Sequence, residues 1–213
     1  MIFDRGISER YRRSIQDAFT TILDKGDDQH KGVIKAIMDS EMLVRVGPVA
    51  QTNASGRTGL ISPVSTNARL LTERLSTRDA FSEIYIFVAE ETIDTGGQRG
   101  CEGTFVHEGQ HAWDFAEAIS SYSNRDYNPI GVTDPSLFDL ELAAHQTAGR
   151  YMLRIGKDDY LQEGLDLMIL GRNADGTYFV NDAGIRQRLN ESYGLQEDGN
   201  IGPRAFHLLG IVV

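Results

Sequence analysis

The pattern of apolar positions predicts two amphipathic helices at the start of the chain. Apolar residues recur at helical spacing between a capping Ser8 and a terminating Gly26. A second, shorter helix is expected at residues 29–40, with His30 at its polar start. The buried side of this second helix is expected to carry Val33, Ile34, Ile37 and Met38.

The segment that follows changes to a pattern typical of strands. Residues 42–49, MLVRVGPV, alternate and are rich in β-branched side chains, whereas TNASGRTG at 52–59 has the composition of a loop. LISPV at 60–64 predicts another short strand, and ARLLTERL at 68–75 predicts a helical connection. The strongest strand pattern is IYIFVA at 84–89, whose continuous apolarity indicates burial on both faces. Together these segments predict a small sheet.

Helical patterns dominate the remainder of the chain. The glycine-rich segment DTGGQRGCEG at 94–103 is expected to turn the chain into a helix that ends near Ser121. Asp134 and Pro135 are suited to the N-cap and first turn of a further helix that ends near Leu153. We expect the rest to contain a helix near 159–169, a hairpin across NADG at 173–176, a helix near 182–192 and a glycine-containing tail.

Composition and charge narrow the class of protein. The 213 residues are 40% hydrophobic and 24% charged, which predicts one domain, with helices and a sheet in about 1–103 and a mainly helical part in about 104–213. The formal net charge of −10 argues against nucleic acid and against anionic membranes as partners. No apolar stretch resembles a Sec-type signal peptide or a transmembrane segment, so we expect a soluble protein. Compartment and oligomeric state stay open.

The stretch TFVHEGQHAWDF at 104–115 places His107, Glu108 and His111 in the spacing H-E-x-x-H. At ~100° per residue the two imidazoles lie ~40° apart on one side of a helix, which is the geometry that a single metal ion needs. Glu108 lies ~100° from His107, where a carboxylate could take the proton of a metal-bound water. The opposite face is apolar. The alternative is a solvated helix face that happens to carry two histidines.

Zinc held by two histidines needs a third protein ligand, and a downstream helix offers one. Glu141 lies in the middle of the apolar stripe of DPSLFDLELAAHQTAGRYML, where a free charge would be costly to bury and metal coordination would offset that cost. His145, one turn further on, could orient a ligand, serve as the third ligand itself, or be a core histidine bonded to backbone. Asp114 could accept a hydrogen bond from an imidazole or be an ordinary solvated carboxylate.

An apolar strand (IYIFVA), a helix with HEGQH and a following helix with Glu in ELAAHQ resemble the core of the zincin metallopeptidases of the gluzincin type, over residues 84–153. The resemblance implies an α+β fold in which the edge strand of a small mixed sheet lines a cleft over the H-E-x-x-H helix. It also implies hydrolysis of a peptide or protein substrate by a Zn²⁺-activated water. His107, His111 and Glu141 would bind zinc and Glu108 would be the general base. His145 stands where many gluzincins carry an acidic residue.

Several points stay open at the level of sequence. The donor that stabilises the oxyanion could be Tyr151, Tyr160, Tyr178, Tyr193 or His207, and packing explains each of them equally well. The rival functions are a non-catalytic zincin-like module that binds metal or a partner, and an effector or toxin-type protease. Peptide deformylase also uses H-E-x-x-H with an upstream cysteine, but Cys101 lies only six residues before His107, so we favour an inert buried thiol.

Overall fold

The computed structural model describes residues 1–212 and begins with the two expected helices. Helix α1 spans Glu9–Lys25; the Ser8 hydroxyl accepts from the Tyr11 amide at its start and Gly26 ends it, as predicted. Helix α2 spans Asp28–Asp39. Met38 was expected on its buried side but is 45% exposed, because it lies ~100° around the helix from the buried Ile37.

His30 is not a solvated residue at a polar helix start. Its imidazole is 2% exposed: Nδ1 accepts from the Asp27 amide at 3.1 Å and Nε2 donates to the Thr147 carbonyl at 3.0 Å. His30 and Asp27 form a reciprocal capping box, so the histidine satisfies the first turn of α2 and ties that turn to the C-terminal half of the chain.

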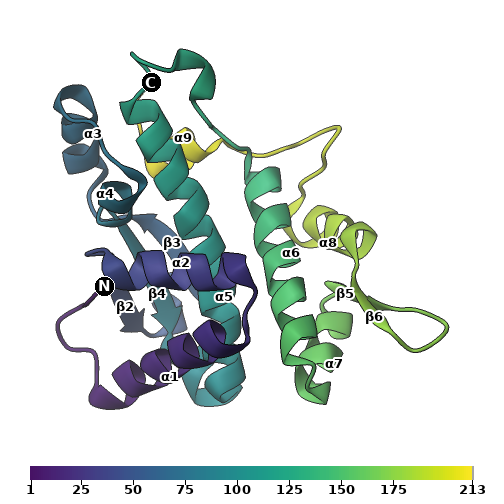
Figure 1. The fold of residues 1–213 in the computed structure, drawn as a ribbon. Helices are drawn as coiled ribbons and strands as arrows, with labels where there is room; N and C mark the ends of the chain where they lie inside the picture. The colour runs from purple at the N-terminus through teal and green to yellow at the C-terminus, as the bar shows by residue number, and fades with distance from the viewer. Residues whose placement is uncertain (213) are drawn as a thin grey trace.

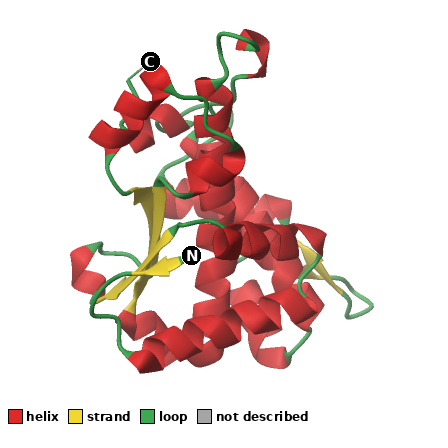
Figure 2. Cartoon of the chain, turned by 60° about the vertical axis from the view of Figure 1, so that its left-hand side comes forward, coloured by secondary structure: helices red, strands yellow, loops and turns green. Residues whose placement is uncertain are grey.

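A mixed four-stranded sheet, seen edge-on in Figure 2, packs beside these helices. Its strands stand in the order β1-β2-β4-β3, with β1, β2 and β4 parallel and β3 antiparallel to β4. Their bounds are Ile2–Phe3 for β1, Leu43–Gly47 for β2, Gly56–Leu60 for β3 and Ile84–Ala89 for β4. The prediction of a buried strand at 84–89 is confirmed, since β4 lies between two neighbours and only Tyr85 is partly exposed.

Strand β3 corrects the prediction of a loop at 52–59 and a strand at 60–64. Residues 56–60 form the strand, paired to β4 from Gly56 opposite Val88 to Leu60 opposite Ile84. Ser62 caps the next helix, α3 (Pro63–Thr72), with Pro63 as its first residue, and α4 (Thr77–Phe81) follows. The short sequence GRTGL has little strand propensity of its own, so the hydrogen bonds offered by β4 decide its conformation.

Helix α5 (Glu90–Ser123) passes through the centre of the molecule (Figure 1). The segment at 94–103 was expected to be a turn, but it is helical except at Gly97, whose φ of +58° bends the helix between residues 90–96 and 98–123. Only glycine adopts that conformation without strain. The second part of α5 runs through the boundary expected near residue 103.

The C-terminal half is mainly helical, as predicted, and its first long helix, α6, lies alongside α5 (Figure 1). Helix α6 spans Leu137–Ile155 and is capped by Ser136 with Asp139 in a capping box. Asp134 is therefore not the N-cap; its carboxylate accepts from the Phe206 amide at 2.9 Å. The other elements are α7 (Asp158–Asp166), the hairpin β5 (Leu170–Arg172) and β6 (Tyr178–Val180), α8 (Asp182–Tyr193) and α9 (Ala205–Leu209).

One main hydrophobic cluster joins the two halves. It contains residues of α1, α2, β4, α5, α6 and α9, from Ile15 to Ile211. A second, smaller cluster packs α8 and the residues after it against the start of α6. Within residues 1–212, none of the helices combines the length and the apolar character needed to cross a bilayer. The core therefore fixes α5 against both the sheet and α6, which positions the candidate site.

Candidate metal centre

His107 and His111 point the same way from α5, as the helical spacing predicted. Their Nε2 atoms are 3.2 Å apart and their rings stand edge to face with centroids 4.7 Å apart. His111 is buried and His107 is partly exposed. The second part of α5 therefore presents two imidazole nitrogens at one point, beside the facing helix α6.

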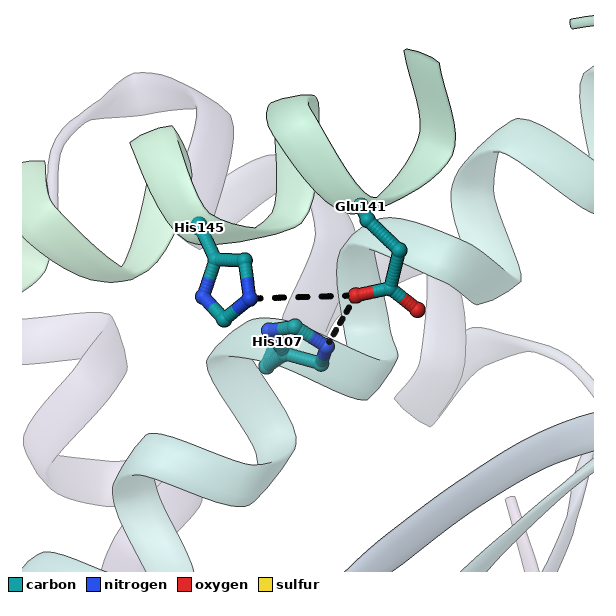
Figure 3. A group of neighbouring side chains, drawn as sticks. All are labelled: His107, Glu141 and His145. Atoms are coloured by element: carbon teal, nitrogen blue, oxygen red, sulfur yellow. Dashed lines mark ion pairs between the residues drawn. The ribbon is translucent and has the colours of Figure 1, made fainter. Parts of the chain in front are cut away.

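Glu141 reaches this point from α6. Its Oε2 lies 3.5 Å from His107 Nε2, and its Oε1 lies 3.6 Å from His111 Nε2. Figure 3 shows the carboxylate directed from α6 toward the His107 ring on α5. The residue is 9% exposed, and Oε2 is buried without a hydrogen-bond partner in the described part of the chain. The structure thus brings together the three residues that the sequence singled out on two separate helices.

The three residues fit a zinc ion. Ligands bonded at about 2.0–2.2 Å in a tetrahedral shell lie about 3.3–3.6 Å from one another. The observed separations of 3.2, 3.5 and 3.6 Å match the edges of such a shell. Two imidazoles and a carboxylate also suit other divalent transition metals. The group can therefore bind a divalent metal ion of this kind.

His145 adds a fourth donor to the group. Its Nε2 is 3.8 Å from Glu141 Oε2, and the ligand atoms of His107, Glu141 and His145 all lie within 4.8 Å of one another (Figure 3). It is 5% exposed, and in residues 1–212 neither of its ring nitrogens has a hydrogen-bond partner. The reading of His145 as a backbone-bonded core histidine is therefore wrong, while its roles as an orienting residue or a ligand both remain compatible with its position.

Two residues of the cluster, Glu141 and His145, are held in the protonation states that metal binding needs. At His111 the carboxylates of Glu141 and Glu108 outweigh burial and raise the pKa, so a metal ion would have to displace a proton there. Burial alone would raise the pKa of Glu141, but the adjacent His107 and His111 imidazoles outweigh it and hold that pKa well below its usual range. Burial lowers the pKa of His145 to about 3, and the neighbouring His107 adds to this effect. An ionised Glu141 and a neutral His145 are the forms that coordinate metals.

Glu108 points from α5 toward the edge strand β3. The Thr58 hydroxyl donates to its Oε2 at 2.7 Å and also approaches its backbone carbonyl at 3.1 Å. A Cβ on Gly56 would come within 2.8–2.9 Å of the Glu108 side chain, so the strand approaches this carboxylate more closely than a larger residue would allow. Sequence reasoning missed Thr58 because it assigned residues 52–59 to a loop.

A cleft runs along β3 on both sides of Glu108. One hollow of about 430 Å³ extends toward α7 and another of about 330 Å³ extends toward α9. The two hollows share five wall residues: Ala54, Gly56, His107, Glu108 and Tyr193. The candidate metal ligands thus lie at the middle of a cleft that an edge strand borders.

Of the five candidate oxyanion donors, Tyr193 has the most suitable position. Tyr151 and Tyr160 donate their hydroxyls to Glu102 Oε2 at 2.7 and 2.8 Å. Tyr178 and His207 line neither hollow, whereas Tyr193 lines both. Burial, together with the nearby Glu141 carboxylate, raises the pKa of Tyr193, so its phenol is protonated at neutral pH and can donate.

Asp114 is neither an ordinary solvated carboxylate nor hydrogen-bonded to an imidazole in the described part of the chain. Its Oδ1 accepts from Gln110 at 2.8 Å, and its Oδ2 has no partner among residues 1–212. The side-chain oxygen of Gln110 in turn accepts from the Gln29 side-chain amide of α2 at 2.6 Å and from the Thr147 hydroxyl of α6 at 3.2 Å. Asp114 is thus the end of a polar network that joins α2, α5 and α6.

Cys101 is sealed in the core, as expected. The side chain is fully buried, with Sγ 3.7 Å from the Ser14 carbonyl. Burial raises the pKa of the thiol to about 12. Cys101 is not among the residues that converge on Glu141, so the deformylase-like ligand set has no support in the geometry.

The chain matches no protein-family model, no curated protein and no solved structure. The assignment of a function therefore depends on the side chains of the site and on the cleft around them.

Proposed function

We propose that this protein is a zinc-dependent peptidase of the zincin type, with Glu108 as its general base. One observation carries the proposal: the Glu108 carboxylate is held by Thr58 in an open cleft, directly beside the group formed by His107, His111 and Glu141. A purely structural metal site needs neither an oriented carboxylate next to its ligands nor a cleft.

Each residue of the site has a separate role in the proposed reaction. His107, His111 and Glu141 would hold the ion, which when bound supplies Lewis acidity for a carbonyl and for an attacking water. Glu108 takes a proton from the water and passes it to the leaving amine. Thr58 keeps the carboxylate in place with its 2.7 Å hydrogen bond. Tyr193 donates a hydrogen bond from its phenol to the oxyanion as charge develops there.

The edge strand favours an extended peptide as the substrate. β3 pairs only with β4 in the described sheet, so its other edge offers unpaired backbone groups along the cleft. An extended peptide can add to such an edge through main-chain hydrogen bonds, with its side chains directed into flanking pockets. The hollows on either side of Glu108 provide room for residues on both sides of the scissile bond.

The proposal is tested by metal analysis together with cleavage of a broad peptide library. We expect about one zinc per wild-type chain and cleavage that stops on chelation. Glu108→Gln should retain zinc and lose at least about 100-fold in kcat, because it removes the base and leaves the ligands. Glu117→Gln, on the exposed face of the same helix, is the matched control and should retain full activity. Cleavage at the wild-type rate by Glu108→Gln would exclude the mechanism.

The position of His145 favours a second candidate, a non-catalytic metal site with four protein ligands. Its Nε2 lies 3.8 Å from Glu141 Oε2 and has no hydrogen-bond partner in the described chain. A shell closed by His145 would leave no position for water or substrate. Cobalt-substituted protein separates the two functions: added acetohydroxamate should change its visible spectrum if a position is open, and should leave it unchanged if His145 closes the shell.

A further inference from the structure

On the side of α5 that carries His107 and His111, the residue one turn toward the N-terminus is a glycine. Gly103 lies four residues before His107, so both residues project from the same side of the helix. Glycine in a helix interior is destabilising relative to alanine, which calls for a packing or functional reason at this position. The surroundings of Gly103 identify that reason.

No packing contact requires glycine at position 103. A Cβ built there would meet no atom within 4 Å, and its φ is not in the left-handed region. Gly100 differs, because a Cβ there would come within 2.5 Å of the Thr92 carbonyl oxygen. Gly103 also lines the 430 Å³ hollow, so the open space beside it is the cleft itself. The absence of a side chain at Gly103 is what extends the cleft to the backbone of α5.

The walls of this hollow beyond Gly103 are mainly apolar. The apolar part is formed by Val106, Ala148, Met152, Leu167 and Ile169, and His145 also borders the hollow. Tyr151 and Tyr160 also line the hollow, but their hydroxyls are turned to the buried Glu102, at 2.7 and 2.8 Å. Because these phenols already have an acceptor, the two tyrosines contribute aromatic ring surface to the walls rather than free donors.

The charged groups at the rim compensate one another. Arg99 Nε lies 3.3 Å from Glu163 Oε2, and another Arg99 nitrogen donates to the Asp159 carbonyl at 2.9 Å. An incoming charged side chain would therefore find no unpaired opposite charge at this rim and would lose its hydration. An apolar side chain has no such hydration to lose, and its binding would remove apolar wall surface from water.

We propose that this hollow, here called the Gly103 pocket, binds a large apolar side chain of the residue next to the scissile bond. The inference depends on the proposed peptidase function, since His107 and Glu108 form the end of the pocket that faces the reaction. The volume of about 430 Å³ is in the range of pockets that enclose small molecules, and it exceeds what an alanine or serine side chain would fill.

Cleavage measurements test the pocket on matched peptides that carry Phe, Leu or Ala beside the bond cut by the wild type. We expect kcat/KM for the Phe and Leu peptides to exceed that for the Ala peptide by at least about tenfold. Gly103→Leu should fill the pocket, remove this preference and leave the zinc content unchanged. Gly32→Leu is the matched control, because a Cβ at this helical glycine of α2 also meets open space but lies outside the cleft.

A binding measurement keeps the pocket and the catalytic proposal distinguishable. Calorimetry on zinc-loaded protein compares acetohydroxamate with a hydroxamate that carries a benzyl group. We expect wild type to bind the benzyl compound at least about tenfold more tightly, and Gly103→Leu to bind both equally. Equal binding by the wild type, or an unchanged preference in Gly103→Leu, overturns the pocket. Preferential binding without any peptide cleavage supports the pocket and refutes the peptidase.

Discussion

Substitution of Glu141 tests the metal centre most directly, because this residue is the proposed ligand from α6. Its carboxylate oxygens lie 3.5 and 3.6 Å from the His107 and His111 nitrogens, and no arginine or lysine is paired with it within residues 1–212. Glu141→Ala removes the only ligand from α6 if His145 is not bound. We expect this change to weaken zinc binding severely while leaving the fold intact.

The magnitude follows from the number of ligands. Four-ligand structural zinc sites bind with about 10–16 kcal/mol, so one ligand contributes on the order of 2.5–4 kcal/mol, or about 100-fold to 1,000-fold in affinity. Zinc at about 1,000 times its dissociation constant stabilises the wild type by about 4.1 kcal/mol. For a chain of this size that energy corresponds to a rise in Tm of about 8–16 °C. A 1,000-fold weaker site would retain only about 1–2 °C of this rise.

The assay compares Tm with zinc and with EDTA in the same variant, together with zinc content by mass spectrometry. The difference between the two conditions cancels any effect of the substitution on the metal-free protein. Glu83→Gln is the matched control: Glu83 is equally buried, at 9% exposure, but it binds Thr66 and Arg69 far from the cleft. This variant should keep the whole zinc-dependent rise.

Stoichiometric zinc and an undiminished rise in Glu141→Ala would refute Glu141 as a ligand. His145→Ala then decides what replaces it, since His145 is the remaining donor in the group. If that variant loses its zinc, the ligand set is His107, His111 and His145. If it also keeps its zinc, the metal centre lies elsewhere and the reasoning from these helices is wrong.

Three further predictions concern residues around the centre. Tyr193→Phe should lower kcat at least about 100-fold with zinc content unchanged, because it removes the oxyanion donor; an unchanged kcat would leave Tyr193 without that role. Burial raises the pKa of Asp114 to about 6, so this carboxyl ionises first in the unfolded chain as pH rises, and the fold loses stability from about pH 4 to pH 6 and does not regain it at higher pH. In urea titrations with EDTA present, Asp114→Asn should therefore be about 2–3 kcal/mol more stable than wild type at pH 7.5 and no more stable at pH 4; equal stability at both would contradict the burial argument. Cys101, whose pKa burial raises to about 12, should react with a thiol reagent at pH 8 only after denaturation, and rapid labelling of the native protein would show that the core opens there.

The sequence was most informative where structure depends on near neighbours. The spacing of His107 and His111 places both rings on one side of any helix, and the structure has their nitrogens 3.2 Å apart. The apolar stripe around Glu141 predicted a buried carboxylate, and it is 9% exposed. Ser8 and Gly26 marked the ends of α1 because capping involves only adjacent residues. By contrast, the sequence favours Asp134 as the N-cap of α6, but Ser136 is the cap. Both residue types cap helices well, and the two differ only because the Phe206 amide, far along the chain, donates to the Asp134 carboxylate.

What only the tertiary structure decided is the environment of these side chains. Residues 56–60 become a strand because β4 supplies hydrogen bonds from 24 to 32 positions away, a partner that no local pattern reveals. Thr58 reaches Glu108 for the same reason, and Gly103 opens a pocket only because α6 and α7 form its other walls. Short-range geometry thus determined which residues bear the chemistry. The cleft around these residues, and the position of His145 beside Glu141, depend on how α5, α6 and the sheet pack. Packing brings together residues that are far apart in the sequence, and no local periodicity in the sequence predicts such contacts.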